Sequence, residues 1–392
     1  MNPNQVRLLI VDDQAMNREV LARRFRPLGY DVTVAEDGAT AIERVEGQPF
    51  DVVILDIMMP DLDGIEVLRR IRERHDPTAL PVVMATSRDD RDDVIRALTL
   101  GANDYVIKPI DFEILLARVK TQVRLMKTTE ALENANHRMK EELQSAARIQ
   151  QSLLPKRLPD LAGIKLAYAY KPCEELGGDI LNIFSLGDDH IGMYLLDVSG
   201  HGVPAALLSS ALSHLLTAAP GEGSILWDRI TGPGGPQLVS PAKVARRLNE
   251  RFPFDSDTCQ YFTLHYGILS CRDRRYTYVS AGHPPPFLLG SGGRAEVLGK
   301  ISPAIGIVDD SSYEDNTHLL AKGDRLYVIS DGILQARNRE DVEFESSRLF
   351  DTIQSLQDRD LEKGVSSVVD SVEAWADGQA QDDVSIVALE ID

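Results

Sequence analysis

The first 127 residues place a polar side chain at the end of one short apolar run after another. The runs VRLLIV, DVVILD, PVVMAT and DYVIKP alternate with stretches of helical periodicity between Val6 and Lys127. This alternation is typical of βα units around a parallel sheet, so we predict five strands and five helices in a doubly wound α/β domain. Functional groups in such sheets lie at the carboxyl ends of the strands, so the residues directly after the runs are the first candidates for a site.

Five of these positions carry groups that fit one chemistry. Asp12 and Asp13 follow the first run, Asp56 ends the third strand, Thr86 the fourth and Lys108 the fifth. Three carboxylates held together repel one another and favour a divalent cation, and Mg²⁺ suits oxygen ligands of this kind. One carboxylate is then available as a nucleophile that accepts a phosphoryl group, while the cation and the lysine stabilise the transferred charge.

The ordered set LLIVDD, VILDIMMPDLDG, VVMATS and DYVIKP resembles the receiver domains of two-component response regulators over about 120 residues. The resemblance implies a flavodoxin-like fold with five parallel strands and a bound Mg²⁺. It also implies that Asp56 is the phospho-acceptor, that Asp12 and Asp13 are metal-binding acids, and that the backbone carbonyl of Met58 is a further ligand.

The same resemblance gives roles to three residues around the acceptor. Thr86 would sense the phosphoryl oxygens, Lys108 would pair with the phosphate, and Tyr105 would swing inward as the switch aromatic. A sensor histidine kinase is the partner that it implies.

A helical segment follows, with no Pro or Gly from Gln122 to Leu153. Apolar residues recur at every seventh position: Leu125, Leu132, Met139, Ala146 and Leu153. The companion heptad positions Gln122, Thr129, Asn136, Leu143 and Gln150 are mostly polar. One reading is a weak parallel coiled-coil homodimer in which Asn136 fixes the register, and the other is a single amphipathic helix packed on its own domain.

Beyond Pro155 and Pro159 the chain becomes rich in short β-type runs, interrupted by two helical stretches at 204–217 and 241–251. We predict that the Gly- and Pro-rich stretch 219–240 is a mobile loop without regular elements, either a flap or a tolerated insertion.

Aspartates in this second half close or follow apolar runs. They are Asp179 in GGD, Asp197 in DVSGHG, Asp331 in SDG, and Asp382 and Asp383 in QDD. Carboxylates gathered from strand ends and Gly-rich turns hold two divalent ions, whose bridging water becomes a nucleophile near neutral pH. A single Asp-Gly is usually a turn, but four such elements in order are more specific.

The set ELGGDILN, LLDVSGHGVPAALLSS, YTYVSAGHPPPFLL, DRLYVISDGILQA and QDDVSIVALE resembles the metal-dependent serine/threonine phosphatases of the PPM superfamily. It is most similar to the bacterial branch with the stage-II-E sporulation phosphatase and RsbU-like stress-response regulators. SAARIQQSLLP is similar to the helix that joins regulatory modules to this domain, so the resemblance covers Ala146 to Asp392.

This second resemblance implies an α+β, αββα sandwich that binds two Mn²⁺ or Mg²⁺ ions. Its metal-binding acids would be Asp179, Asp197, Asp331 and Asp382, with the Val198 carbonyl as an added ligand. The neighbouring Asp383 is a further candidate ligand.

The chain departs from the family pattern at Asn182, where many relatives have the second Asp of GGDxxD, and at Ser385, where a Thr is frequent. Because Asp179 is intact, we expect Asn182 to alter outer-shell bonding more than catalysis. His201 and His283 lie in glycine turns, where a general-acid role and a structural hydrogen bond are both open.

Charge and cysteine content exclude several classes of protein. A net charge of −19 argues against a nucleic-acid partner. Cys173, Cys259 and Cys271 form no CxxC pair, so neither a disulfide framework nor a zinc site is indicated. No signal pattern and no apolar stretch of ~20 residues is present, so we expect a cytoplasmic protein with no membrane partner.

The three segments predict a receiver at 1–125, a helical coiled-coil linker at 126–155 and a phosphatase at 156–392. The expected function is a response regulator whose phosphorylation controls a protein phosphatase, with a phosphorylated STAS-type anti-sigma-factor antagonist as the substrate. The alternative is a catalytically silent adaptor that binds a sigma factor or its regulator. A nucleotide-cyclising or c-di-GMP output lacks its motifs, because GGDIL is not a GGDEF-type loop in this context.

Overall fold

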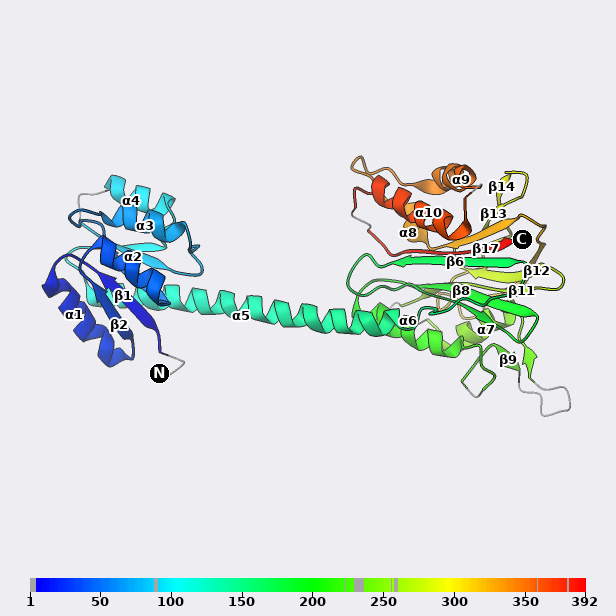
Figure 1. The fold of residues 1–392 in the computed structure, drawn as a ribbon. Helices are drawn as coiled ribbons and strands as arrows, with labels where there is room; N and C mark the ends of the chain where they lie inside the picture. Colours follow the sequence, from blue (N-terminus) through cyan, green and yellow to red (C-terminus); the bar gives the residue numbers. More distant parts are fainter. Residues whose placement is uncertain are drawn as a thin grey trace. The chain divides into compact units, whose positions relative to one another are not determined.

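Two units make up the chain, residues 1–140 and 141–392 (Figure 1). The computed structural model describes residues 5–87, 91–221, 223–228, 236–254, 256, 260–357, 359–378 and 381–392. Cys259 lies outside these ranges, as do residues 222 and 229–235 of the predicted loop. Each unit has its own cores and is described by itself.

The first unit contains the predicted parallel sheet, in the order β2-β1-β3-β4-β5. Its strands are β1 (Arg7–Val11), β2 (Asp31–Ala35), β3 (Val52–Asp56), β4 (Val82–Thr86) and β5 (Asp104–Ile107). Successive strand residues contribute to opposite faces, and β3 and β4 are buried throughout, which explains why their sequences read as continuous apolar runs. The prediction of five parallel strands is confirmed.

Helices cover both faces of this sheet. They are α1 (Ala15–Phe25), the 3₁₀ turn η1 (Arg26–Leu28), α2 (Gly38–Gly47), α3 (Gly64–Arg72), α4 (Arg91–Thr99) and α5 (Phe112–Gln151). The cluster around Leu8 and Ile10 joins α1 and the start of α5 to one face, while the cluster around Leu9 and Val11 joins α2, α3 and α4 to the other.

Helix α5 is one element of 40 residues, so the last receiver helix and the predicted linker are continuous. Its first turns are buried against the sheet through Leu115 and Val119, whereas residues 130–142 are exposed. The boundary between the two units falls inside it, after Lys140. Despite its length this helix is too polar to cross a bilayer, and none of the other helices in the described ranges meets that requirement.

The second unit is a sandwich of two antiparallel sheets, in the orders β15-β12-β11-β8-β7 and β14-β13-β16-β17-β6. Strands of the first sheet are β7 (Ile180–Ser185), β8 (His190–Val198), β11 (Phe262–Ser270), β12 (Arg275–Ala281) and β15 (Asn316–Leu319). Strands of the second sheet are β6 (Ile164–Lys171), β13 (Phe287–Leu289), β14 (Ala295–Val297), β16 (Arg325–Ile329) and β17 (Val384–Ile391). Side chains such as Met193 and Val387 fill the space between the sheets.

Helices cover the outer face of each sheet, which completes the predicted αββα arrangement. Helices α6 (Val203–Leu215) and α7 (Pro241–Arg251) pack on the first sheet. Helices α8 (Asp331–Gln335), α9 (Glu345–Ser355) and α10 (Leu361–Trp375) pack on the second. In Figure 1 these two helical layers lie on opposite sides of the stacked sheets.

Two sequence predictions for this unit were wrong. Only α6 and α7 were foreseen, and α8 to α10 were not. The valines, serines and Gly364 of α10 have low helix propensity, but Leu361, Val365, Val368 and Val372 line one buried face at helical spacing. Packing of that face outweighs propensity.

Regular structure also occurs in the stretch predicted to have none. Strands β9 (Trp227–Asp228) and β10 (Gln237–Leu238) pair within 219–240. Leu226 and Val239 beside them are buried in the core under α6 and α7. These two apolar residues therefore anchor the Gly- and Pro-rich stretch.

Candidate functional site

The carboxyl edge of the receiver sheet brings three of the predicted groups into direct contact. Lys108 Nζ donates to Asp12 Oδ2 at 2.9 Å and to Asp56 Oδ2 at 2.5 Å. Both aspartates are buried, and so is Thr86 on the neighbouring strand β4. They meet because β1, β3 and β4 are parallel, so that their carboxyl ends share one edge.

Burial and charge shift the acid–base properties of this cluster. Burial raises the pKa of Asp56 above its ordinary value, although the hydrogen bond and positive charge of Lys108 oppose the shift. Burial lowers the pKa of Lys108, but its hydrogen bonds to Asp56 and Asp12 raise it by more, so the net shift is upward. Ligand oxygens of Asp12, Asp13 and Asp56 lie within 4.8 Å of one another, a spacing that suits a shared divalent cation.

The remaining predicted receiver residues surround this cluster. Met58 N donates to Asp56 Oδ1 at 3.2 Å, so the loop that carries the Met58 carbonyl is tied to the predicted acceptor. Tyr105 is half-buried, with the Arg118 guanidinium 5.8 Å from its ring centre. Asn17, which the sequence did not point to, donates to both Asp12 oxygens at 3.1 Å.

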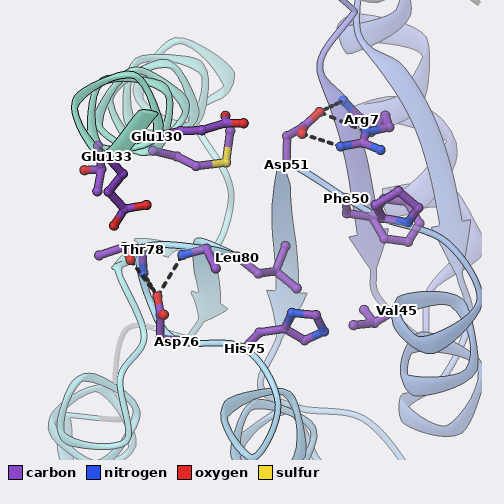
Figure 2. A pocket seen from close by; sticks show the side chains of 14 residues that line it. Arg7, Val45, Phe50, Asp51, His75, Asp76, Thr78, Leu80, Glu130 and Glu133 are labelled. Carbon is purple, nitrogen blue, oxygen red and sulfur yellow. Dashed lines mark hydrogen bonds and ion pairs between the residues drawn. The ribbon is translucent and has the colours of Figure 1, made fainter. Parts of the chain in front are cut away.

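A separate hollow of about 400 Å³ opens at the opposite edge of the receiver sheet (Figure 2). Arg7 and Asp51 form an ion pair on one side of it, and Glu130 and Glu133 extend from α5 on the other. Because β1 begins at Arg7 and β3 begins after Asp51, this hollow lies at the amino ends of the strands. It is therefore not part of the phospho-acceptor edge.

In the second unit the five predicted acids come from four different elements or loops. Asp197 lies near the end of β8, Asp331 begins α8, Asp179 precedes β7, and Asp382 and Asp383 precede β17. The loops touch: a side chain at Gly178 would start 2.7 Å from the Val198 carbonyl oxygen, and one at Gly332 would start 2.2 Å from the Asp383 carbonyl oxygen. These close approaches explain the glycines of the GGD and SDG motifs.

Burial raises the pKa of four of these carboxyl groups, and the charges of neighbouring acids add to the shift at three of them. Burial, followed by the charges of Asp331, Asp382 and Asp383, raises the pKa of Asp197 to about 8. Burial and the charges of Asp197 and Asp383 raise the pKa of Asp179 well above its ordinary value. Burial also raises the pKa of Asp331 and of Asp382. The structure thus brings all five predicted acids into one electrostatic cluster.

The donor set fits divalent cations. Asp179 is 2% exposed, and its Oδ2 has no hydrogen-bond partner within the described ranges. A buried carboxylate oxygen without a partner is costly unless a cation or proton compensates it. Oxygen donors of this kind suit Mg²⁺ and Mn²⁺.

Asp383 holds the loop between β6 and β7 in place. Its Oδ1 accepts the Cys173 N–H at 2.9 Å, and its Oδ2 accepts the Asp179 N–H at 3.0 Å. The sequence suggested Asp383 as a metal ligand, and the structure adds that its two oxygens orient the segment that carries Asp179.

The two histidines have different surroundings. His283 is fully buried, and its Nδ1 lies 2.7 Å from the Thr263 hydroxyl, on the residue paired with Asp197. Burial lowers its pKa to about 3, although a backbone hydrogen bond with Ile329 opposes the shift. His201 is exposed, with its Nδ1 3.2 Å from Glu174. His283 therefore supports the strand behind Asp197, while His201 lies on the open side.

Asn182 makes its contacts within the first sheet. Its Oδ1 accepts the Ile183 N–H at 2.8 Å, and Asn182 is paired with Tyr194 on the neighbouring strand β8. Ser385 is buried two residues after Asp383, and its N–H donates to Ser330 Oγ at 2.9 Å.

Three residues near the acids escaped the sequence reasoning. Ser330 joins the SDG and QDD segments, since its hydroxyl donates to the Asp383 carbonyl at 3.0 Å. Gln150, near the end of α5, donates from Nε2 to the Gly177 carbonyl at 2.7 Å and accepts the Gly177 N–H at 3.3 Å. The Cys173 thiol lies with Asp382 and Asp383, all ligand atoms being within 4.8 Å. Only for Gln150 did the sequence offer a sign of a special role, because a polar residue occupies a heptad position there.

Two family models match the chain, one for each unit. The family described as Stage II sporulation protein E (SpoIIE) matches residues 187–392, and the family described as Response regulator receiver domain matches residues 8–120. The transcriptional activator protein IrlR of Burkholderia pseudomallei is 40% identical over 119 residues, 30% of this chain and 51% of IrlR. Protein IcfG of Synechocystis is 27% identical over 247 residues, 60% of this chain and 38% of IcfG. The chain thus spans about half the length of these relatives, or less.

Among solved structures, the SiaA-PP2C domain of Pseudomonas aeruginosa is similar with a TM-score of 0.54 at 22% identity, covering 66% of this chain and 99% of that domain. At this identity the similarity shows the fold. Fold and acidic cluster define a PPM-type phosphatase domain that follows a response regulator receiver domain. The chain belongs to the SpoIIE family.

Proposed function

We propose that this chain is a cytoplasmic response regulator in which phosphorylation of Asp56 by a sensor histidine kinase controls a metal-dependent protein serine/threonine phosphatase. The phosphatase assignment rests above all on Asp179 Oδ2, which is buried and has no hydrogen-bond partner among the described residues, inside a cluster of carboxyl groups with raised pKa values. The preferred substrate class is a phosphorylated STAS-type anti-sigma-factor antagonist, which follows from the family and not from a contact in this chain.

In the receiver, Asp12, Asp13, Asp56 and the Met58 carbonyl would hold Mg²⁺. Lys108 already contacts Asp56 and is placed to pair with an incoming phosphoryl oxygen. Thr86 lies buried on β4, and Tyr105 lies on β5, the strand that pairs with β4. These two side chains would therefore be the first to move when Asp56 is phosphorylated.

In the phosphatase, Asp179, Asp197, Asp331 and Asp382 would hold two Mn²⁺ or Mg²⁺ ions, with Asp383 and the Val198 carbonyl close by. Bound divalent ions supply Lewis-acid activation of water and phosphate. The chain's own contribution is placement: Asp383 fixes the Asp179 segment, and Ser330 fixes the segment that precedes Asp331. The exposed Asp382 leaves the cluster open to a phosphorylated loop of another protein.

Communication between the two units would pass along α5. A coupling of ~1–3 kcal/mol, the usual allosteric range, would change activity about 5- to 150-fold. A catalytically silent adaptor is the second candidate, but a degenerate site has no need to retain five acids in one cluster.

The decisive experiment measures Mn²⁺-dependent hydrolysis of a phosphoserine peptide by the full chain. We expect Asp331→Asn to lower turnover about 100-fold or more, since Lewis-acid activation contributes several kcal/mol. Asp351→Asn, on the exposed side of α9, is the matched control and should keep wild-type turnover. Beryllofluoride, a phosphoryl mimic, should change wild-type activity and leave Asp56→Asn unaffected. Equal activity of wild type and Asp331→Asn would refute the phosphatase site.

A further inference from the structure

Cys173 adds a sulfur atom, a soft metal ligand, to the acidic cluster of the second unit, which otherwise offers hard oxygen donors. Its sulfur and one oxygen each of Asp382 and Asp383 all lie within 4.8 Å of one another. The backbone keeps it there, because the Cys173 N–H donates to Asp383 Oδ1 at 2.9 Å. Cys173 is partly exposed and Asp382 is exposed, so a dissolved ion reaches both.

A second observation at the same place points to a cation. Asp179 is 2% exposed, its Oδ2 lacks a partner within the described ranges, and its N–H is bonded to the other oxygen of Asp383. The Asp179 carboxylate also feels the charges of both Asp382 and Asp383. The buried Asp179 oxygen thus belongs to a residue that is hydrogen-bonded to Asp383, one of the three candidate ligands.

Ligand type decides which cations this edge prefers. Carboxylates alone favour Mg²⁺ and Mn²⁺, whereas a thiolate favours softer ions such as Zn²⁺. Zinc takes one sulfur and two carboxylate oxygens with a water in a tetrahedron, at about 2.3 Å to sulfur and about 2.0–2.2 Å to oxygen.

We propose that Cys173, Asp382 and Asp383 form a site for a thiophilic divalent cation, zinc being the ion of choice, and that its occupation expels the hard ions of the phosphatase centre. The second half of this proposal rests on the proposed function, because Asp382 would serve both kinds of ion. Binding converts the Cys173 thiol to a thiolate and releases its proton to solvent, with no change of oxidation state. The protein would thus be switched off by a rise in free zinc.

Cadmium is the probe for the thiol ligand, because a thiolate–cadmium bond gives an ultraviolet charge-transfer band. The full chain has three cysteines, so the Cys259→Ser/Cys271→Ser variant keeps Cys173 alone. We expect this variant to develop the band on titration with Cd²⁺ and to saturate at one ion per chain. Absence of the band in this variant, or a wild-type band that disappears with Cys271→Ser, overturns the site.

Expulsion of manganese is measured by electron paramagnetic resonance of free Mn²⁺ as Zn²⁺ is added to the Mn²⁺-loaded full chain. We expect Cys173→Ser to need at least about 10-fold more Zn²⁺ than wild type to release Mn²⁺, in line with the usual cost of altering a metal site. Equal release in both proteins overturns the inhibitory role. Cys173→Ala, checked for unchanged tryptophan fluorescence, repeats the comparison if the serine variant misfolds.

Both readouts are independent of turnover. A cadmium band and manganese release without hydrolysis of phosphoserine peptide would leave this site standing and reject the phosphatase proposal. Hydrolysis with no cadmium band would do the reverse.

Discussion

His265 is a titratable side chain with no exposure to solvent. It lies on β11, with Nε2 2.6 Å from the Tyr276 hydroxyl and Nδ1 3.0 Å from the Ser280 hydroxyl. Burial, followed by the charge of His283, lowers its pKa well below the ordinary value. One hydroxyl can donate a hydrogen bond to a neutral imidazole and the other can accept one from it, so the folded protein holds His265 uncharged.

This burial makes stability depend on pH. An unfolded histidine binds a proton near pH 6.5, while the folded His265 does not, so acid favours the unfolded chain. We expect the free energy of unfolding to fall between about pH 7.5 and about pH 5 by about 2 kcal/mol more in wild type than in His265→Gln. Denaturant unfolding followed by tryptophan fluorescence measures this, because both tryptophans, Trp227 and Trp375, lie in the phosphatase unit.

Exposed His214 on α6 provides the control. His214→Gln should retain the wild-type dependence on pH. A His265→Gln variant with the wild-type acid sensitivity would show that the imidazole becomes protonated without unfolding.

Among the site residues, the sequence best located those at the ends of predicted strands. Asp12, Asp56 and Lys108 meet because parallel strands bring their carboxyl ends to one edge, which is a rule that sequence periodicity can invoke. Ser330 and Cys173 could not be placed in this way. Their contacts with Asp383 join segments separated by 53 and 210 residues, and local pattern carries no information about such distances.

At the scale of elements, the end of α5 is fastened to the GGD loop. Gln150 is 6% exposed and bonds both the N–H and the carbonyl of Gly177, two residues before Asp179. Its Nε2 also lies 3.3 Å from Ser209 Oγ on α6, the helix that follows the DVSGHG loop. One amide therefore joins the end of α5 to both the GGD loop and α6.

Removing this amide should weaken the metal site more than the fold. We expect Gln150→Ala to raise the Mn²⁺ concentration needed for half-maximal hydrolysis by about 10-fold, as for other groups that orient metal ligands. The neighbouring Gln151 is exposed, so Gln151→Ala should leave the Mn²⁺ requirement unchanged. If both variants respond alike to Mn²⁺, Gln150 has no role in positioning the loop.

Helices α9 and α10 show where prediction of elements failed. The valines and serines of α10 favour strand or turn by propensity, and its helical form depends on packing against β6 and β17. Helix α9 packs against α8 and α10. The αββα architecture became visible from the sequence through family resemblance, whereas periodicity alone supplied only two of the covering helices.

For the whole molecule, the exposed middle of α5 is the part through which we predict self-association. Leu125, Leu132 and Met139 recur every seven residues and are each more than half exposed. The first and last of the companion heptad positions are Gln122 and Gln150. Both are buried within their own units, so they are not available to pair with a second copy of the helix. A seam between two copies is therefore limited to the stretch between them.

Disulfide cross-linking tests the dimer in solution. In a background without the three natural cysteines, we expect Leu132→Cys to give a covalent dimer under mild oxidation. Asn134→Cys, two residues along and on the far side of the helix from the seam, should remain monomeric. Formation of dimer at neither position, with or without beryllofluoride, would favour a single helix.

Because α5 is continuous, insertions and deletions within it during evolution have a predictable geometric effect. An α-helix turns by about 100° per residue, so one inserted or deleted residue rotates everything beyond it by that angle. Seven residues return the helix to within about 20° of its original phase. Lengthening the helix by a heptad thus preserves the angular relation between the two ends, whereas adding two residues nearly reverses it. Selection on signalling would act on the length of this helix in steps of seven.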